Sequence, residues 1–380
     1  MKTIFLIRNI APDCYGGAES YQIELAKILK KNDFCPIIFT ASKKLLTIAK
    51  QNHIQAIQAP YIKRQNWSGW RNILLPIYIF WQFKLYFWYK KQIRKYSPTA
   101  INIQSRDEWI SATIAARKTH TQVFWTDHAD FRNWVFTNIN IKYKNFIGKY
   151  ILKLSTIPDK IITISDFEAS WLRKNVKLPR NNIMILKNGV IDQKHDYDNI
   201  KPLENNFCYV GRIVDYKGIS ELIEAFNIIS HDNPSATLHI YGDGPDYEKY
   251  CQSAKSNQNI HFYGYTKEPL KAMAQSEVFI LPSYYEGLSI SLLEASMMQK
   301  TIIATNVDGN PEVVLNDHTG FTIPPRDADA LAHAMQKILD DKKLARSLAK
   351  NARLHYEQEF NFTHNVEQSL IPLLTNKEML

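Results

Sequence analysis

Short apolar runs alternate with helical patterns along the first half of the chain. Thr3–Ile7 is continuously apolar, and a glycine-containing loop separates it from a stretch starting at Ala18 whose apolar residues fall on one helical face. Such runs are typical of strands buried on both faces of a parallel sheet. The same pattern predicts further strands at Cys35–Thr40, Ala100–Ile103, Val123–Thr126 and Lys160–Ile164. It indicates a parallel sheet covered by helices.

The second half begins the same pattern again. Phe207–Val210 predicts a strand, and a helix is expected from about Gly218. Further strands are predicted at Thr237–Tyr241, Ile260–Tyr263, Val278–Leu281 and Thr301–Ala304. A single helical pattern then runs from Ala328 to about Tyr356. The fold class predicted is α/β, with two Rossmann-like, doubly wound parallel sheets.

A polar stretch with few large apolar side chains separates the halves and is typical of a linker. We therefore predict an N-terminal domain at 1–190, a linker at 191–206, a C-terminal domain at 207–355 and a tail at 356–380 that packs back toward the N-terminal domain. Ligands of such sheets bind beyond the carboxyl ends of the strands. Functional residues are therefore expected in loops after strands, facing a cleft between the domains.

Charge is distributed unevenly along the chain. Residues 1–190 hold 30 Lys and Arg against 11 Asp and Glu, whereas the rest holds 17 against 26. A basic first half suits anionic lipid or an anionic glycan, or is simply a solvated surface. No recognisable nucleic-acid-binding motif is present, so nucleic acid is not expected as a partner.

The cysteines and the N-terminus indicate a cytoplasmic protein. The four cysteines form no CxxC pair, which is typical of reduced thiols rather than of disulfides or a zinc site. Arg8 ends the first apolar run too early for a signal peptide. Pro76, Gln82 and Lys84 interrupt the apolar stretch Ile73–Tyr89, so no transmembrane helix is expected.

Two glycine-containing loops follow predicted strands. Gly16-Gly17 precedes the first helix, where glycines allow close approach of a ligand and the helix start favours an anion; an ordinary tight turn explains the pair equally well. It is not a full GxGxxG, which disfavours a dinucleotide-dependent dehydrogenase. The second loop is Gly211-Arg212 with Lys217, whose two cations can hold a diphosphate and stabilise the charge that grows on it; two surface cations are the alternative.

The most specific pattern is Glu286 followed, after seven residues, by Glu294. Glu286 and Gly287 lie in the loop after a predicted strand, and Glu294 is expected about two turns into the next helix. The helix start near Leu288–Ser291 offers free N–H groups to phosphate. Glu294 can accept hydrogen bonds from ribose hydroxyls, while Glu286 meets a sugar.

The sequence carries two weaker signals. His128 follows a predicted strand and can hydrogen-bond a sugar hydroxyl, although a structural histidine is the favoured interpretation from position alone. The Asp-x-Asp pairs Asp196/Asp198 and Asp327/Asp329 fall in the linker and at a helix start. Neither pair is expected to bind a metal ion.

The combined motifs resemble glycosyltransferase family 4, which has the GT-B fold. The resemblance is clearest over 205–330 and rests on the Arg212/Lys217 loop, Glu286/Glu294, the GDGP turn at Gly242–Pro245 and NPE at Asn310–Glu312. It extends more weakly to Gly16-Gly17, His128, Ile162–Phe167 and Lys187–Asp192. The family often has two glycines where this chain has Asp308-Gly309.

The resemblance implies a set of residue roles. Arg212 and Lys217 would bind the donor diphosphate, with Gly16 and Gly17 beside it. Glu294 would bind the ribose and Glu286 the donor sugar. Backbone at Gly287, Leu288 and Ser289 would meet the phosphates or sugar, and His128 would touch the transferred sugar. The catalytic set expected is therefore Glu286, His128, Arg212 and Lys217, with no metal or other cofactor.

The function expected is a retaining hexosyltransferase of polysaccharide or lipopolysaccharide biosynthesis. It would move a sugar from a UDP- or GDP-sugar to a lipid-linked or cell-surface glycan. The stretch Tyr61–Tyr96 is rich in aromatics and cations, and a second basic run spans Lys142–Lys153; both suit the anionic inner face of the cytoplasmic membrane. An ordinary buried aromatic helix is the alternative to membrane attachment. The alternative functions are a nucleotide-sugar epimerase, a phosphorylase and a non-catalytic GT-B-like partner protein.

Overall fold

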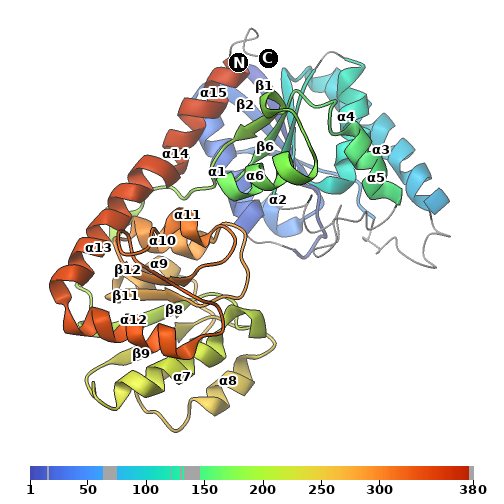
Figure 1. Cartoon of the computed structure of the whole chain (residues 1–380). Coiled ribbons are helices and arrows are strands. Elements are labelled where there is room, and N and C mark those ends of the chain that lie inside the picture. The colour runs from blue at the N-terminus through green and yellow to red at the C-terminus, as the bar shows by residue number, and fades with distance from the viewer. Residues whose placement is uncertain (15–16, 63–74, 120, 129–130, 132–145, 376–380) are drawn as a thin grey trace. The chain divides into compact units, whose positions relative to one another are not determined.

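The computed structural model describes the chain except residues 15–16, 63–74, 120, 129–130, 132–145 and 376–380. It divides into two compact units, Met1–Asn188 with Thr363–Leu380, and Gly189–Phe362 (Figure 1). Each unit has its own parallel sheet and its own hydrophobic core.

The described part of the first unit contains a seven-stranded sheet in the order β3-β2-β1-β4-β5-β6-β7. Its strands are β1 (Lys2–Ile7), β2 (Phe34–Thr40), β3 (Gln55–Gln58), β4 (Ala100–Ile103), β5 (Gln122–Asp127), β6 (Lys160–Thr163) and β7 (Ile183–Ile185). Every pairing is parallel; Leu6, for example, lies between Ile38 and Asn102. The strand order reverses between β1 and β4, which is where sheets of this kind bind ligands.

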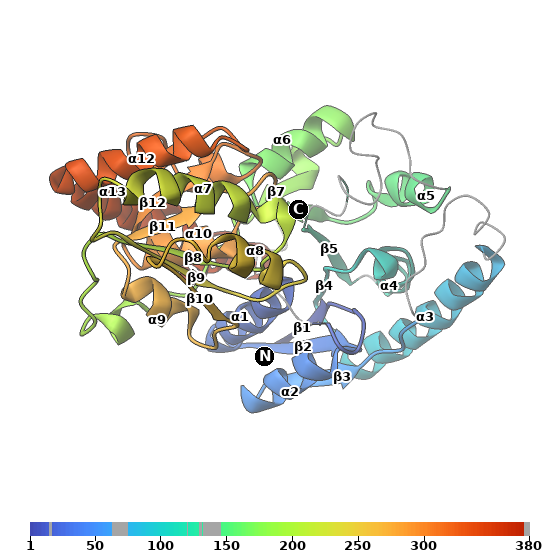
Figure 2. The same cartoon turned by 90° about the horizontal axis from the view of Figure 1, so that it is seen from below.

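Helices cover this sheet on both sides. They are α1 (Gly17–Lys31), α2 (Lys43–Gln51), α3 (Leu75–Tyr96), α4 (Trp109–Arg117), α5 (Phe146–Leu154) and α6 (Asp166–Asn175). Ser42 and Ser165 begin α2 and α6 because their hydroxyls accept the N–H groups of Leu45 and Glu168. Figure 2 shows α3 as a long helix that runs beside α4.

Stacked aromatic rings fill the core between α4 and the sheet. The rings of Trp109 and Trp125 are stacked with centroids 4.8 Å apart, and Phe131 stacks on Trp109. The indole of Trp125 donates to the Thr113 hydroxyl at 2.8 Å, so its buried N–H is satisfied. The end of the chain, with α15 (Ile371–Thr375), belongs to this unit; the ammonium of Lys2 donates to the carbonyl of Leu374 at 3.2 Å.

The second unit contains a six-stranded parallel sheet in the order β10-β9-β8-β11-β12-β13. Its strands are β8 (Asn206–Val210), β9 (Thr237–Tyr241), β10 (Ile260–Gly264), β11 (Val278–Leu281), β12 (Thr301–Thr305) and β13 (Phe321–Ile323). Its helices are α7 (Ile219–Ser230), α8 (Tyr247–Ser253), α9 (Pro269–Ala274), α10 (Ile290–Met297), α11 (Asn310–Val313), α12 (Ala328–Asp340) and α13 (Lys342–His355), after which α14 (Phe362–Asn365) leads into the first unit.

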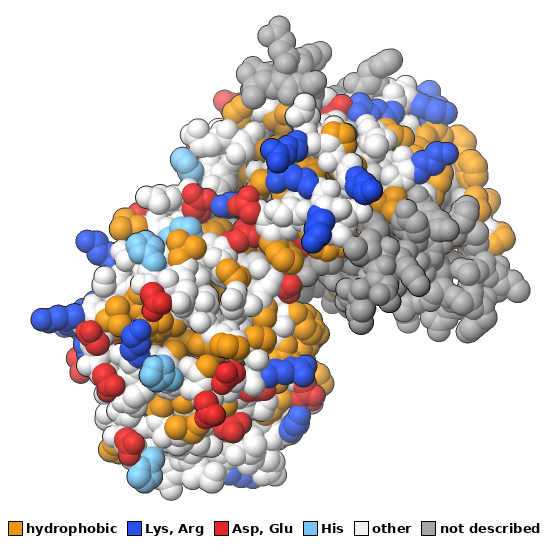
Figure 3. Space-filling model, in the orientation of Figure 1, with side chains coloured by type: hydrophobic (Ala, Val, Ile, Leu, Met, Phe, Trp, Pro, Cys, Tyr) orange, Lys and Arg blue, Asp and Glu red, His pale blue; other side chains and the backbone are white. Residues whose placement is uncertain are grey.

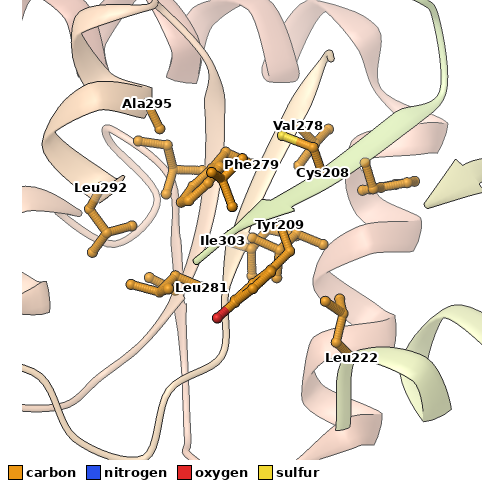
Figure 4. Packing of buried hydrophobic residues seen from close by; sticks show 14 of the residues in the cluster. Cys208, Tyr209, Leu222, Val278, Phe279, Leu281, Leu292, Ala295 and Ile303 are labelled. Atoms are coloured by element: carbon orange, nitrogen blue, oxygen red, sulfur yellow. The ribbon is translucent and has the colours of Figure 1, made fainter. Parts of the chain in front are cut away.

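The core of the second unit lies between this sheet and its helices. Figure 4 shows Tyr209, Phe279 and Ile303 from neighbouring strands, together with Leu222 of α7 and Leu292 of α10, all of which belong to this core. Helices α7 and α12 lie side by side (Figures 1 and 2). The strand order reverses between β8 and β11, so the loops after these two strands form the expected ligand edge.

The structure confirms the predicted fold class and every predicted strand, and it corrects one helix. The pattern from Ala328 to Tyr356 is two helices, because the chain turns at Asp341, whose carboxylate caps α13 by accepting the N–H groups of Lys343 and Leu344. Strands β3, β7 and β13 were not predicted; they are three or four residues long, and β3 is half polar.

Candidate functional site

Three glycines shape the loops around the carboxyl end of β8. A Cβ at Gly242 would lie 1.7 Å from the carbonyl oxygen of Gly211, and the φ of Gly242 is +152°. Gly218 has a φ of +70°, and a Cβ there would lie 2.1 Å from the carbonyl oxygen of Pro282. Only glycine allows these close approaches. The last of them brings the loop after β8 against the loop after β11.

That approach pairs Lys217 with Glu286. The Lys217 ammonium contacts a carboxylate oxygen of Glu286, and both side chains are mostly buried, with 15% and 11% of their surface exposed. The Ser283 hydroxyl donates to the same oxygen at 2.8 Å. The backbone N–H of Glu286 donates to the carboxylate of Asp308 at 2.9 Å. A cation and a carboxylate are thus held together at the end of the sheet.

Asp308 stands where the family often has the first of two glycines, and its conformation and contacts account for this difference. Its φ is +44°, a left-handed conformation that glycine adopts readily and aspartate tolerates. In return its carboxylate holds the backbone of Glu286. Gly309 must stay a glycine, since a Cβ there would lie 2.3 Å from the carbonyl oxygen of Gly287.

Gly287 is different, because none of the described residues requires a glycine there. Among them, no heavy atom would lie within 4 Å of a Cβ on Gly287, and its φ is not in the left-handed region. Leu288, which follows, is buried. The Cα side of Gly287 is therefore open to a ligand, although its carbonyl accepts the N–H of Gly309 at 3.1 Å.

The start of α10 adds backbone donors and a second carboxylate. Ser289 is the N-cap in an extended conformation, and its side chain makes no capping hydrogen bond. The first N–H groups of a helix have no partner within the helix and favour an anion. Glu294 is the fifth residue of α10, so it lies early in the second turn rather than two turns in. Burial raises the pKa of its carboxyl to about 7.

Two tyrosines beside this loop were missed by the sequence reasoning. The rings of Tyr216 and Tyr285 are stacked with centroids 4.5 Å apart. Tyr285 is more than half exposed, and the Lys217 ammonium lies 5.6 Å from the Tyr216 ring centroid. Each tyrosine precedes a predicted site residue, which is the signal that could have found them. Arg212 has an exposed side chain, and its backbone carbonyl is held by the Tyr209 hydroxyl at 2.8 Å.

His128 lies in the first unit, directly after β5, where its ring is held by neighbours. The ring lies edge-on to Tyr21, and Nε2 is 3.3 Å from the side-chain oxygen of Gln104. Arg8 bonds the carboxylate of Glu19 at 2.8 Å and the carbonyl of Gln104 at 2.7 Å. Burial, and secondarily the Arg8 charge, lower the pKa of His128 to about 3. His128 is therefore neutral at physiological pH.

The predicted site residues thus divide between the two units. The structure brings together Lys217, Glu286 and Gly287, followed by Leu288, Ser289 and Glu294 on the same loop and helix, with Arg212 on the loop before Lys217. Gly17 is the exposed first residue of α1 in the other unit. Gly16 lies outside the described residues.

Two findings on the described part of the chain concern metal binding and membrane crossing. No group of three or more His, Cys, Asp or Glu side chains there is arranged to hold a metal ion. Asp327 caps α12 by accepting the N–H of Ala330 at 2.8 Å, which accounts for that Asp-x-Asp pair. Within the same residues, no helix is long and apolar enough to cross a bilayer.

Two family models together match residues 15–355. The description "Glycosyltransferase Family 4" matches 15–194, and "Glycosyl transferases group 1" matches 190–355. The chain belongs to glycosyltransferase family 4. The second match contains the whole loop cluster around Lys217 and Glu286.

Relatives of this family 4 member are found among curated proteins and solved structures. It is 31% identical over 222 residues to the capsular polysaccharide biosynthesis glycosyltransferase CapM of Staphylococcus aureus, covering 53% of this chain and 57% of that protein. It is 25% identical to the UDP-Gal:alpha-D-GlcNAc-diphosphoundecaprenol alpha-1,3-galactosyltransferase of Escherichia coli, covering 73% and 76%. The alignment with CapM thus spans little more than half of that relative.

Solved structures share the fold over the whole chain. The crystal structure of HepE from Anabaena in complex with UDP superposes with a TM-score of 0.74 at 17% identity, covering 99% of this chain and 100% of that one. At this identity the likeness concerns the fold alone. It agrees with the two parallel sheets described above and identifies the fold as GT-B.

Proposed function

We propose that this protein is a retaining hexosyltransferase that moves a sugar from a nucleotide-sugar donor to a glycan acceptor. The observation that carries the proposal is the loop cluster at the edge of the second sheet. There a cation on the loop after β8 meets a carboxylate on the loop after β11, which also carries an open backbone position and leads into the start of a helix. Family membership supports the same reaction class.

Donor binding follows from the charges of this cluster. The diphosphate binds at the start of α10, with Lys217 and Arg212 as its cations. The carboxylate of Glu294 accepts hydrogen bonds from the ribose hydroxyls. Glu286 accepts hydrogen bonds from the donor sugar, with the backbone at Gly287, Leu288 and Ser289 against the sugar or phosphates. The family resemblance also assigns Gly16 and Gly17 to the diphosphate.

The reaction breaks the bond between the anomeric carbon and the diphosphate oxygen, and it forms a bond from that carbon to an acceptor hydroxyl oxygen. The proton of the acceptor hydroxyl is released. Negative charge grows on the leaving diphosphate, and preorganised cations are worth most where charge develops. Lys217 is preorganised by its contact with Glu286. His128, being neutral, contributes a hydrogen bond to the transferred sugar rather than a charge.

The proposed acceptor is a lipid-linked or cell-surface glycan of polysaccharide or lipopolysaccharide biosynthesis. CapM is named for capsular polysaccharide, and the Escherichia coli relative is named for a diphosphoundecaprenol-linked acceptor. The site needs no metal ion in this proposal, and the protein works in the cytoplasm at the inner face of the membrane. UDP is the first nucleotide to test because HepE was solved with UDP.

A thermal-shift titration with UDP-, GDP- and ADP-sugars, with and without EDTA, tests the donor assignment. A ligand that binds the folded state raises the apparent stability. We expect one nucleotide class to raise the melting temperature selectively, the shift to persist in EDTA, and Glu294→Ala to abolish it. No shift with any nucleotide sugar would favour a non-catalytic GT-B-like protein. Analysis of the product's anomeric configuration by NMR tests whether the transfer is retaining.

A further inference from the structure

Helix α3 exposes large apolar side chains on the side that does not pack against the sheet. Phe80, Phe83 and Phe87 are 73%, 60% and 63% exposed, and Ile77 is 52% exposed. The opposite side of the helix is buried through residues such as Leu85. Figure 3 shows hydrophobic side chains gathered along this edge of the first unit, with Lys and Arg side chains among them. A contiguous exposed patch of this kind marks a binding surface.

The patch continues into an apolar groove between α3, α4 and α5. The groove has a volume of about 360 Å³. Ile79, Phe83 and Tyr86 line it from successive turns of α3, facing Ile114 of α4 and Tyr150 of α5. The same phenylalanine, Phe83, therefore belongs both to the exposed patch and to the groove wall.

Cations stand at one end of the groove. The ammonium groups of Lys118 and Lys90 lie 5.4 and 5.7 Å from the centroid of the Tyr86 ring. Lys84 lies 5.3 Å from the ring centroid of Trp81 on the same helix. Helices α3, α4 and α5 contain no Asp or Glu. Asp107, which precedes α4, is paired with Arg106.

We infer that this surface docks on an anionic phospholipid bilayer and that the groove takes up one lipid chain. We call it the α3 face: Ile77, Phe80, Phe83 and Phe87, the groove beneath them, and Lys84, Lys90 and Lys118. The α3 face combines apolar side chains with ammonium groups. A bilayer offers the matching hydrocarbon and anionic phosphate, so we assign it as the occupant. A helix that lies in a membrane interface has this composition of aromatics and cations. Docking would bring the protein to a lipid-linked acceptor, and only this role of docking rests on the proposed function.

The geometry assigns different parts of the lipid to different residues. Phe80, Phe83 and Phe87 recur at three- and four-residue spacing, so they enter the hydrocarbon boundary together. One chain lies between Ile79, Ile114 and Tyr150. Its phosphate meets the ammonium groups of Lys90 and Lys118, which both lie over the Tyr86 ring.

Vesicle co-sedimentation tests the docking. Wild-type protein is expected to pellet with vesicles containing 30% phosphatidylglycerol and much less with pure phosphatidylcholine. The variant F80S/F83S/F87S is expected to bind at least about tenfold more weakly, because three apolar side chains no longer leave water. The control L203S/I228S/L354S removes exposed apolar side chains from the second unit and should bind like wild type.

Charge reversal tests the cationic end. K90E/K118E is expected to lose about tenfold or more in affinity for the anionic vesicles. The control K31E/K50E makes the same charge change at exposed positions of α1 and α2 and should have a much smaller effect. Equal losses in both variants would mean that net charge alone drives binding, and would overturn the assignment to the α3 face.

Monomeric dihexanoyl-phosphatidylglycerol tests the groove separately. Native mass spectrometry is expected to show one lipid bound to wild type and none to I79W/I114W, whose indoles fill the groove. That variant should still pellet with vesicles. Undiminished binding of the short lipid would overturn the chain site, and a circular dichroism melt checks that each variant is folded.

Two further outcomes would overturn the docking itself. One is wild-type protein that binds neither vesicle. The other is a wild-type dimer, detected by light scattering, that dissociates in F80S/F83S/F87S while this variant still binds vesicles. A second copy of the chain would then cover the α3 face. Nucleotide-sugar binding is measured on every variant. Failed docking with donor binding intact refutes only this inference, whereas docking without donor binding refutes only the proposed function.

Discussion

The candidate residues lie where the strands of the two parallel sheets end, at the carboxyl-terminal edge of each sheet. The two edges are built alike, yet their polar groups have different partners. At the edge of the first sheet, Arg8 bonds Glu19 and the Gln104 carbonyl, while His128 contacts the Gln104 side chain. At the edge of the second sheet, Lys217 contacts Glu286 beside an open backbone at Gly287 and an uncapped helix start. The polar groups named at the first edge bond to one another, whereas the second edge leaves donors for a ligand.

The pKa shifts sharpen this difference. Burial removes the charge of His128 in the first unit, because it lowers the histidine pKa to about 3. Burial raises the pKa of Glu294 in the second unit to about 7, which leaves that carboxyl poised to change charge near neutrality. We therefore expect substitutions at the second edge to change activity strongly through charge. Substitutions at the first edge should change it weakly and without a charge effect.

Lys217→Met is expected to have the largest effect. Removing the cation should lower the rate of transfer by about 10²–10³-fold, as loss of one preorganised group facing developing charge does. Lys249→Met is the matched control, since Lys249 is an exposed lysine of the same unit, paired with Asp215. Steady-state rates with the donor identified by thermal shift measure both. A loss below about threefold in Lys217→Met would mean that this cation does not face the diphosphate.

Gly287→Ala and Gly309→Ala are expected to differ from each other. A methyl group at Gly287 meets no atom of the residues that the structure describes, so stability should change by less than about 0.5 kcal/mol while donor affinity falls at least about tenfold. A methyl group at Gly309 meets the Gly287 carbonyl, so stability should fall by about 1–3 kcal/mol. Denaturant unfolding and donor titration separate the two. Unchanged donor affinity in Gly287→Ala would remove this backbone from the site.

The sequence predicted the second edge better than the first for a physical reason. Glu286, Gly287 and Glu294 lie on one loop and the helix that follows it. Their spacing along the chain therefore determines how they are arranged in space. Lys217 joins them because its loop approaches the loop after β11 at Gly218. The network around His128 instead joins β1, α1, β4 and β5, and no spacing in one sequence indicates that Arg8 and Gln104 meet there.

The fold was predictable wherever the apolar runs were long enough to be buried on both faces. Strand β3, with the sequence QAIQ, has no such run because it lies at the edge of its sheet. The break at Asp341 was missed because the apolar periodicity of α12 continues into α13, and only the capping carboxylate ends it. The Tyr216–Tyr285 stack follows from the same approach of two loops that positions Lys217.

Glu294 is expected to make donor affinity depend on pH. If the ionised carboxylate holds the ribose hydroxyls, a pKa of about 7 leaves about tenfold less of it ionised at pH 6 than at pH 8. Affinity for a nucleotide sugar should fall by about that factor on acidification. Calorimetric titration of wild type and Glu294→Gln measures it, and the variant should bind weakly with no such pH dependence. A pH-independent wild type would place the ribose elsewhere.

The same carboxyl should affect stability in the opposite direction. Its pKa in the folded protein is raised above the ordinary 4.5, so the folded state binds the proton more tightly than the unfolded chain. This group therefore lowers stability as the pH rises from about 4.5 through 7. Glu294→Gln should be more stable than wild type at pH 8, and the difference should vanish toward pH 4. Urea unfolding at the two pH values is the measurement.

His128 is expected to give the smallest change. Because its pKa is lowered to about 3, the imidazole stays neutral from pH 5 to 8, and His128→Gln, which keeps a neutral hydrogen-bonding group, should retain activity within about threefold with the same pH profile. His128→Ala should lose about tenfold through the missing hydrogen bond. Folding gives an independent check, since protonation of the unfolded chain lowers wild-type stability as the pH falls from about 6.5 toward 3. His128→Gln should flatten that decline. A pH–rate profile whose acidic limb near 6.5 disappears in His128→Gln would show a charged histidine in the reaction, and the first edge would then be as electrostatically active as the second.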